Sequence, residues 1–154
     1  MLSDDGATEI VPGVTAITTG GHFPGSLVLH TDASCEPEWV DGERKGRLFI
    51  ADTLVTVPSA LYSKNRPPGT TSYGFYWSIP NMIPLAPDDI RGIWRALEGW
   101  EFGSTHGAFV GLDVEDDLRE GGGGRVKERV RESMRIQARG MGWVGEYGLG
   151  EEWP

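Results

Sequence analysis

Short alternating runs of apolar and polar residues occupy the N-terminal third of the chain, and this pattern is typical of β-strands. Glu9 to Thr19 alternates in this way around a Pro12-Gly13 interruption, and Ser26 to Thr31 forms a second run. Arg47 to Ala51 is apolar after its first residue, which predicts a strand buried on both faces. The polar residues 32–46 predict a long hairpin loop between the last two strands.

Two later segments have the period of an amphipathic helix. Asp88 to Trp100 follows a proline and begins with two aspartates, which favour a helix N-terminus. Arg125 to Met141 is the second segment, and glycines mark its end. The stripes expected to face the core are Ile90, Ile93, Trp94 and Leu97 in the first helix, and Val126, Val130, Met134, Gln137 and Met141 in the second.

The remaining segments are less regular. Glu101 to Thr105 predicts a short strand that leads to His106-Gly107, and a second apolar run follows from Ala108 to Val114. Tyr73 to Pro84 is aromatic and apolar, but its prolines forbid one regular element. We expect this stretch to be either a loop packed over the core or the apolar wall of a pocket.

These elements predict an α+β fold with an antiparallel or mixed sheet and two main helices. The length of 154 residues and the hydrophobic fraction of 38% fit one folded domain over residues 1–154. Residues 1–8 and 143–154 are expected to be loose termini.

The charge of the chain limits its partners. Lys and Arg number 14 against 23 Asp and Glu, which gives a net charge of −9. A chain this acidic repels phosphates, so we expect neither nucleic acid nor an anionic membrane as partner. The basic residues from Arg125 to Arg139 are interpreted as a charged helix face, with a binding patch as the alternative.

Cysteine content and hydropathy point to a soluble protein of the cytoplasm. Cys35 is the only cysteine, so no disulfide within the chain is possible. Its neighbours are acidic, which favours an inert thiol over a nucleophile. No run approaches the roughly 20 apolar residues of a membrane span, and the first residues do not form a signal peptide.

Three polar residues stand where expected strands meet turns: His22, Asp52 and His106. Imidazole and carboxylate are ligands for zinc, manganese or iron. Glycines beside both histidines would leave room for an ion or a substrate. The alternative is that His22 and His106 are turn residues bonded to the backbone. We expect His30 to cap a strand end at the surface.

Two stretches carry a resemblance to a known family. The first stretch is Thr18-Thr19-Gly20-Gly21-His22-Phe23-Pro24-Gly25-Ser26, and the second is Leu48-Phe49-Ile50-Ala51-Asp52-Thr53-Leu54. His106-Gly107 follows later in the chain. Together they resemble the second half of the metallo-β-lactamase superfamily. The resemblance is close from Glu9 to about Leu54 and fair around His106. It implies half of an αββα sandwich, with zinc as the usual metal.

The same resemblance implies roles for the three residues. His22 would hold a first metal ion, Asp52 would bridge two ions, and His106 would hold the second. The metal activates water for attack on a small-molecule substrate such as a lactam, thioester, lactone or phosphate ester. The histidines of this chain stand at 22, 30 and 106, so the family's His-x-His-x-Asp-His signature is absent.

We therefore expect the C-terminal half of a metal-dependent hydrolase, from a truncated gene product or an incomplete gene model. Its activity is expected to be impaired or absent, with at most one weakly held zinc ion, so whether it is an enzyme stays open. The alternative is a non-catalytic remnant that associates through its uncovered sheet face. A third interpretation is an unrelated acidic binding module.

Overall fold

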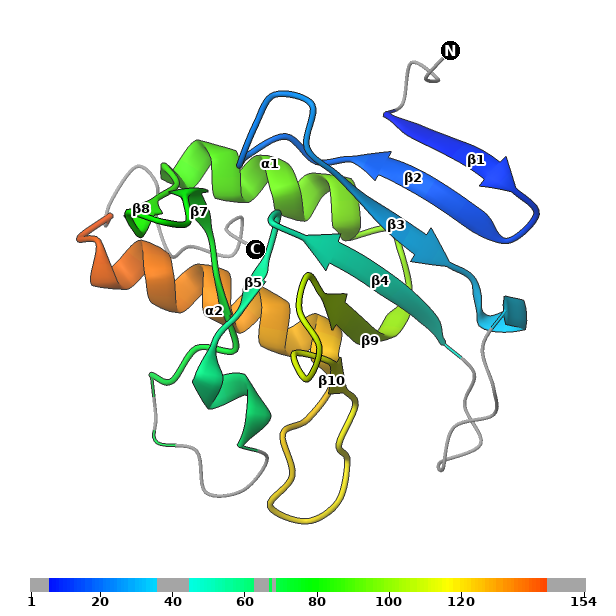
Figure 1. Ribbon diagram of the computed structural model, residues 1–154. Coiled ribbons are helices and arrows are strands. Elements are labelled where there is room, and N and C mark those ends of the chain that lie inside the picture. The colour runs from blue at the N-terminus through cyan, green and yellow to red at the C-terminus, as the bar shows by residue number, and fades with distance from the viewer. Residues whose placement is uncertain (1–5, 36–44, 63–66, 68, 144–154) are drawn as a thin grey trace.

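The computed structural model describes residues 6–35, 45–62, 67 and 69–143, and the expectations for residues 1–5, 36–44 and 144–154 lie outside this range. Its main sheet has the strand order β1-β2-β3-β4-β9-β10, and only the β4–β9 pair is parallel (Figure 1). The strands are β1 (Ala7–Val11), β2 (Val14–Thr18), β3 (Leu27–Thr31), β4 (Gly46–Ala51), β9 (Phe102–Gly107) and β10 (Val114–Glu115).

Smaller elements fill the connection from β4 to β9. Two short antiparallel pairs lie there: β5 (Val55–Thr56) with β6 (Tyr73–Gly74), and β7 (Tyr76–Ser78) with β8 (Ile83–Pro84). The 3-10 helix η2 (Pro58–Leu61) and the helix α1 (Pro87–Leu97) also lie in this connection. The 3-10 helix η1 (Ala33–Cys35) precedes β4, and the helix α2 (Val126–Gly140) follows β10. The described residues thus form an α+β fold with a mixed sheet and two main helices, as the sequence predicts.

The N-terminal run is a hairpin rather than one interrupted strand. Pro12 and Gly13 connect β1 to β2, and Gly13 has a φ of +80° that suits glycine. Residues 7 and 8 belong to β1, so the expectation of a loose terminus is wrong for them. A bulge between Glu9 and Val11 interrupts the pairing of β1 with β2.

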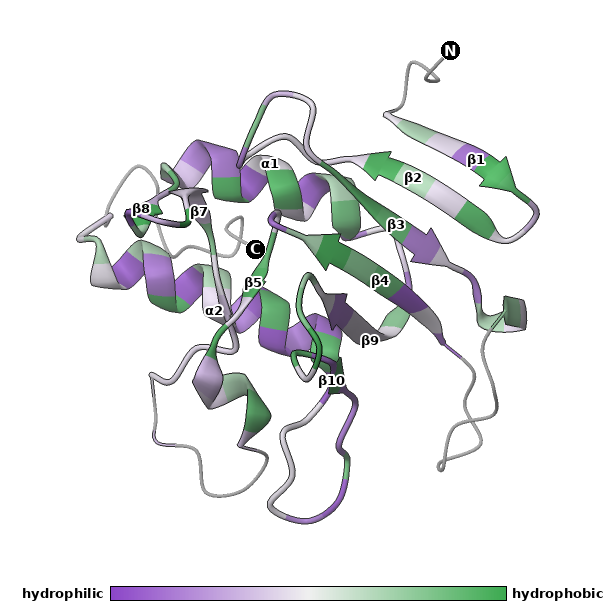
Figure 2. Ribbon diagram, in the orientation of Figure 1, coloured by the Kyte–Doolittle hydropathy of each residue, from purple (hydrophilic) through white to green (hydrophobic). Residues whose placement is uncertain are grey.

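Both helices pack on one face of the sheet. Strand residues that point to this face, such as Ile17 and Leu48, share one buried cluster with Ile93 of α1 and Val130 of α2. Figure 2 shows apolar residues alternating with polar ones along both helices. This pattern explains why the helical period of the apolar residues can be recognised in the sequence. α1 ends at Leu97, three residues before the predicted end.

The opposite face of the sheet is partly exposed. β4 alternates, with Leu48 and Ile50 fully buried but Phe49 36% exposed, so the expectation of burial on both faces is wrong. The physical reason is that the helices cover one face only. Leu27 on β3 is 42% exposed, and Phe49 pairs across the sheet with Leu29 and His106.

Two histidines differ from expectation in position. His30 is 6% exposed, its Nε2 lies 2.9 Å from the carbonyl oxygen of Glu101, and its ring contacts Trp100. It is buried because β3 is an interior strand and His30 lies on the helix-covered face beside Leu48. His106 lies within β9 rather than in a turn after it, and residues 108–113 form no strand.

Candidate metal centre

The loop that carries His22 is shaped by two glycines. Gly20 and Gly21 have φ values of +63° and +82°, which L-residues with a side chain rarely adopt. The backbone N–H of Phe23 donates to Ser26 Oγ at 2.8 Å, and this bond closes the turn. The loop returns the chain from β2 into β3 and places His22 against the β7–β8 pair.

The tautomer of His22 follows from its partner. Its Nδ1 lies 2.8 Å from the carbonyl oxygen of Tyr76, which can only accept, so Nδ1 carries the proton. In the neutral ring, Nε2 then has a free lone pair. A metal-binding histidine is usually held in this way, with the other ring nitrogen bonded to a carbonyl or carboxylate.

Asp52 stands at the end of β4, directly after a residue with an unusual backbone. Ala51 has a φ of +42°, and the N–H of Thr53 donates to the carbonyl oxygen of Ile50 at 3.0 Å. This tight turn brings the carboxylate toward the His22 loop. Thr19 and Thr53 join the two loops through a hydroxyl–hydroxyl hydrogen bond of 3.3 Å.

The structure brings His22 and Asp52 together. Nε2 of His22 lies 3.9 Å from Oδ2 of Asp52. Two ligands of one tetrahedral zinc ion are roughly 3.3 Å apart, given metal–ligand bonds of about 2.0–2.1 Å. The Asp52 side chain is 52% exposed and can rotate to close the difference, whereas that of His22 is 9% exposed and held in place.

His106 lies with other partners. Its Nδ1 is 2.5 Å from Oδ1 of Asp113, and its ring is 5.4 Å from the ring of Phe49. Within the part of the chain that the structure describes, no group of three His, Cys, Asp or Glu side chains is placed to hold a metal. The structure therefore brings His22 and Asp52 together as a pair, and it does not gather His106 with them.

Several residues that shape this site were not singled out from the sequence. The Tyr76 carbonyl, the Thr19–Thr53 pair and Asp113 all depend on tertiary contacts. The contact from His22 to Tyr76 spans 54 positions and involves a backbone atom, so no side-chain pattern could indicate it. Thr19 stands just before the Gly20-Gly21-His22 turn, and Thr53 directly follows Asp52. This closeness in the sequence is the signal that could have indicated the two threonines as part of the site.

The fold defines an α+β protein with a mixed sheet, and the comparisons with known proteins add one relative. No family model matches the chain, and no solved structure matches it either. The chain is 27% identical over 128 residues to "Uncharacterized protein YmaE" of Bacillus subtilis (strain 168), and the match covers 82% of this chain and 35% of that protein. The chain thus spans about a third of the length of this relative.

None of the helices among the described residues combines the length and apolar character that a membrane crossing requires.

Proposed function

We propose that His22 and Asp52 bind a zinc ion, and that the chain represents the C-terminal half of a metallo-β-lactamase-type hydrolase acting on a small molecule. The observation that carries the proposal is the orientation of His22. Its protonated Nδ1 is fixed by the Tyr76 carbonyl, which leaves the Nε2 lone pair 3.9 Å from the Asp52 carboxylate. The same hydrogen bond fits the alternative of a turn histidine bonded to the backbone, and the nearby Asp52 carboxylate is what favours a metal ligand.

Bound zinc would supply a Lewis acid that polarises a carbonyl or phosphoryl oxygen of the substrate. The residues of the chain have separate tasks. His22 is rigid and sets the position of the site, while Asp52 adjusts and offers the negative charge that a divalent cation needs. Because the described residues offer two converging ligands rather than three, we expect weak zinc binding and little or no hydrolysis by this chain alone.

The test is a zinc titration of purified protein in competition with a chromophoric chelator. We expect His22→Ala and Asp52→Asn each to weaken zinc binding at least tenfold. Asp52 is half exposed, so Asp52→Asn should keep the fold, and circular dichroism checks this. An affinity that is unchanged in Asp52→Asn contradicts the proposal.

His106→Ala serves as the matched comparison. His106 contacts Asp113 and Phe49 instead of the His22–Asp52 pair. We therefore expect the zinc affinity of His106→Ala to stay within about twofold of that of the unsubstituted chain. Loss of binding in His106→Ala would instead support the ligand role that the family resemblance implies.

A second candidate function is a non-catalytic interaction domain. The observation in its favour is the sheet face opposite the helices, where Leu27 and Phe49 are 42% and 36% exposed. Exposed apolar patches are found at association sites. A chain that binds no zinc but forms a defined dimer would favour this function over hydrolysis.

A further inference from the structure

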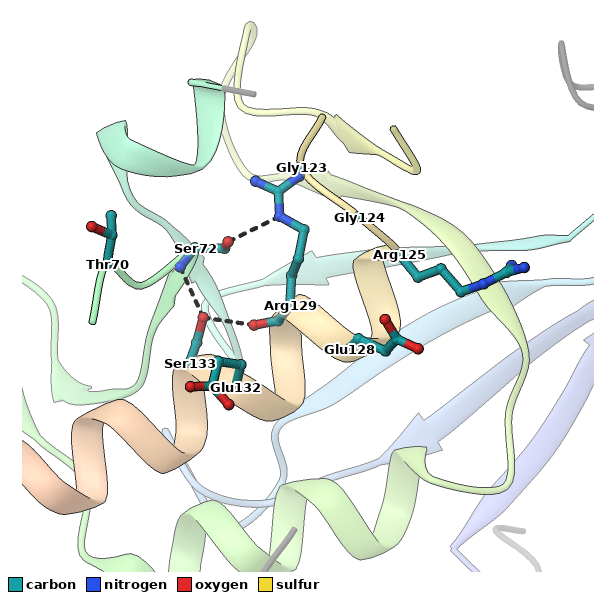
Figure 3. Close-up of a pocket in the computed structure, with 9 residues that line it drawn as sticks. All are labelled: Thr70, Ser72, Gly123, Gly124, Arg125, Glu128, Arg129, Glu132 and Ser133. Carbon is teal, nitrogen blue, oxygen red and sulfur yellow. Dashed lines mark hydrogen bonds between the residues drawn. The ribbon is translucent and has the colours of Figure 1, made fainter. Parts of the chain in front are cut away.

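A pocket of about 230 Å³ beside the first half of α2 contains Arg129 (Figure 3). The guanidinium of Arg129 donates to Ser72 Oγ at 3.0 Å and to the carbonyl oxygen of Ala60 at 2.6 Å. These bonds connect α2 to η2 and to the chain before β6, and Arg129 is 7% exposed. We therefore assign this arginine to the stability of the fold. Arg125, one turn earlier, extends away from Arg129 in Figure 3.

Another pocket, of about 280 Å³, lies where α2 meets α1 and the start of β9. Its volume is close to the lower end of the range of about 300–1,000 Å³ that is typical of small-molecule sites, so it suits a ligand the size of a single ring. None of its lining residues belongs to the candidate metal centre. They are Lys45, Trp94, Glu101, Phe102, Asp116, Arg125, Lys127, Glu128 and Arg131.

Three basic residues of this second pocket are engaged by carboxylates. Lys45 Nζ lies 2.8 Å from Oδ2 of Asp116, and Arg125 Nη1 lies 3.8 Å from the same oxygen. Lys127 Nζ donates to Oε1 of Glu101 at 2.8 Å. Because each of these cations has a carboxylate beside it, we assign all three to the wall of the pocket.

Arg131 is different, because it makes no ion pair with any residue in the described part of the chain. Its guanidinium carbon lies 5.9 Å from the centre of the Trp94 ring, a distance at which the ring face attracts a cation. Its Nε is buried and has no hydrogen-bond partner among the described residues. A buried N–H without an acceptor is unfavourable. An anion beside the terminal nitrogens would therefore stabilise this guanidinium.

The surroundings of Arg131 favour an anion with one charge and a flat apolar body. The planar donors of a guanidinium match the two oxygens of a carboxylate. Trp94 is partly buried against the core, and Phe102, which is 1% exposed, adds apolar wall. The net charge of −9 repels every anion, and it repels a dianion such as a phosphate ester more strongly than a monoanion.

We propose that this pocket binds a small aromatic monocarboxylate, with its carboxylate at Arg131 and its ring beside Trp94 and Phe102. Glu128 is exposed and stands one turn before Arg131 on α2, so its negative charge opposes the ligand. The two residues therefore act on the ligand in opposite directions. Loss of the Arg131 charge weakens binding, and loss of the Glu128 charge strengthens it.

The test is a titration of ¹⁵N-labelled full-length protein in metal-free buffer, followed by backbone amide chemical shifts. Zinc binding at His22 and Asp52 then has no influence on the outcome. The probes are benzoate, acetate and benzamide, which carry the ring with the charge, the charge alone and the ring alone. We expect saturable benzoate shifts at Phe102 and Lys127, and affinities at least tenfold weaker for the other two probes. No saturable shift with benzoate, or equal affinity for benzamide, overturns the proposal.

Arg131→Gln keeps a long polar side chain but removes the charge. We expect it to weaken benzoate binding at least tenfold and to leave the binding of benzamide unchanged. Arg139→Gln, at an exposed position of the same helix, is the control and should change neither. Equal losses for benzoate and benzamide in Arg131→Gln would contradict a contact between the guanidinium and the carboxylate.

Glu128→Gln should strengthen benzoate binding severalfold. Glu132→Gln is its control, because Glu132 is also exposed on α2 but does not line this pocket. Since Glu128 is exposed, its substitution should keep the fold even if Arg131→Gln does not, and circular dichroism checks both variants. Benzoate binding that is the same in Glu128→Gln and Glu132→Gln contradicts the assignment of the site.

Discussion

Gly20 and Gly21 are neighbours with similar backbone angles but different surroundings. A Cβ on Gly20 would meet nothing within 4 Å, whereas one on Gly21 would lie 2.7 Å from Cδ1 of Ile93. The His22 loop therefore passes directly over α1 at Gly21. Backbone conformation alone explains the first glycine, and close packing is an additional reason for the second.

We expect Gly20→Ala to lower the free energy of unfolding by about 1–2 kcal/mol, the cost of a side chain in the left-handed region. Gly21→Ala should cost about 1–3 kcal/mol more, because the new methyl overpacks against Ile93. Chemical denaturation of both variants measures the difference. Equal losses would mean that the loop moves away from α1 without cost.

At the residue scale, the sequence was informative where local chemistry decides the structure. The Gly-Gly-His and Ala-Asp-Thr stretches predicted two turns, and the structure places His22 and Asp52 within 3.9 Å. The prediction for His30 was wrong because a single histidine at a strand end does not reveal which face it occupies. Only the pairing of β3 with β4 puts His30 on the buried face.

Gln137 is an example of one side chain that connects two elements. It stands on the inner stripe of α2, where an apolar residue would be usual, and its amide bonds the backbone of Phe75 twice. Oε1 accepts from the Phe75 N–H at 3.1 Å, and Nε2 donates to the Phe75 carbonyl oxygen at 2.9 Å. Since Tyr76 follows directly, the same contact also supports the carbonyl that orients His22.

We expect Gln137→Met, which keeps the volume but removes both bonds, to lower the free energy of unfolding by about 2 kcal/mol or more. Leaving a buried polar group unpaired costs about 1–3 kcal/mol. Thermal or chemical denaturation gives the value, and Arg139→Met on the exposed side of the same helix is the control. A loss of less than about 0.5 kcal/mol in Gln137→Met would show that water replaces the amide.

At the element scale, long periodic segments were predictable and short ones were not. Both helices were found, because a stripe of apolar residues repeats over several turns. The sequence predicts either a packed loop or a pocket wall for Tyr73 to Pro84, and the structure divides this stretch. Tyr73 and Phe75 are fully buried, while Trp77 is 55% exposed on β7. Strands of two or three residues carry too few positions for a period to be read.

The molecule as a whole presents two different sides of one sheet. Helices cover one side, and the other exposes Phe49 and Leu27. The strand order and the parallel pairing of β4 with β9 could not be predicted from local pattern, since the paired residues are 56 or 57 positions apart in the sequence. The half-sandwich that the family resemblance implies stays a prediction.

We expect the chain to form a dimer through this exposed face at high concentration. The paired substitution Phe49→Gln and Leu27→Gln should shift it to a monomer, because burial of these side chains drives association. Light scattering across a concentration series measures this, with Val110→Gln, a fully exposed apolar residue in the β9–β10 loop, as the control. A chain that is monomeric at all concentrations contradicts the prediction.

The bulge in β1 has a consequence for how copies of this chain can meet. An uninterrupted edge strand recruits another strand, and each addition leaves a new edge, so growth has no natural end. Here one edge is broken between Glu9 and Val11, and the other is the two-residue strand β10. Fibre-like extension is therefore disfavoured at both edges. Contact through a face is self-limiting, because a two-fold pair covers the surface that formed it.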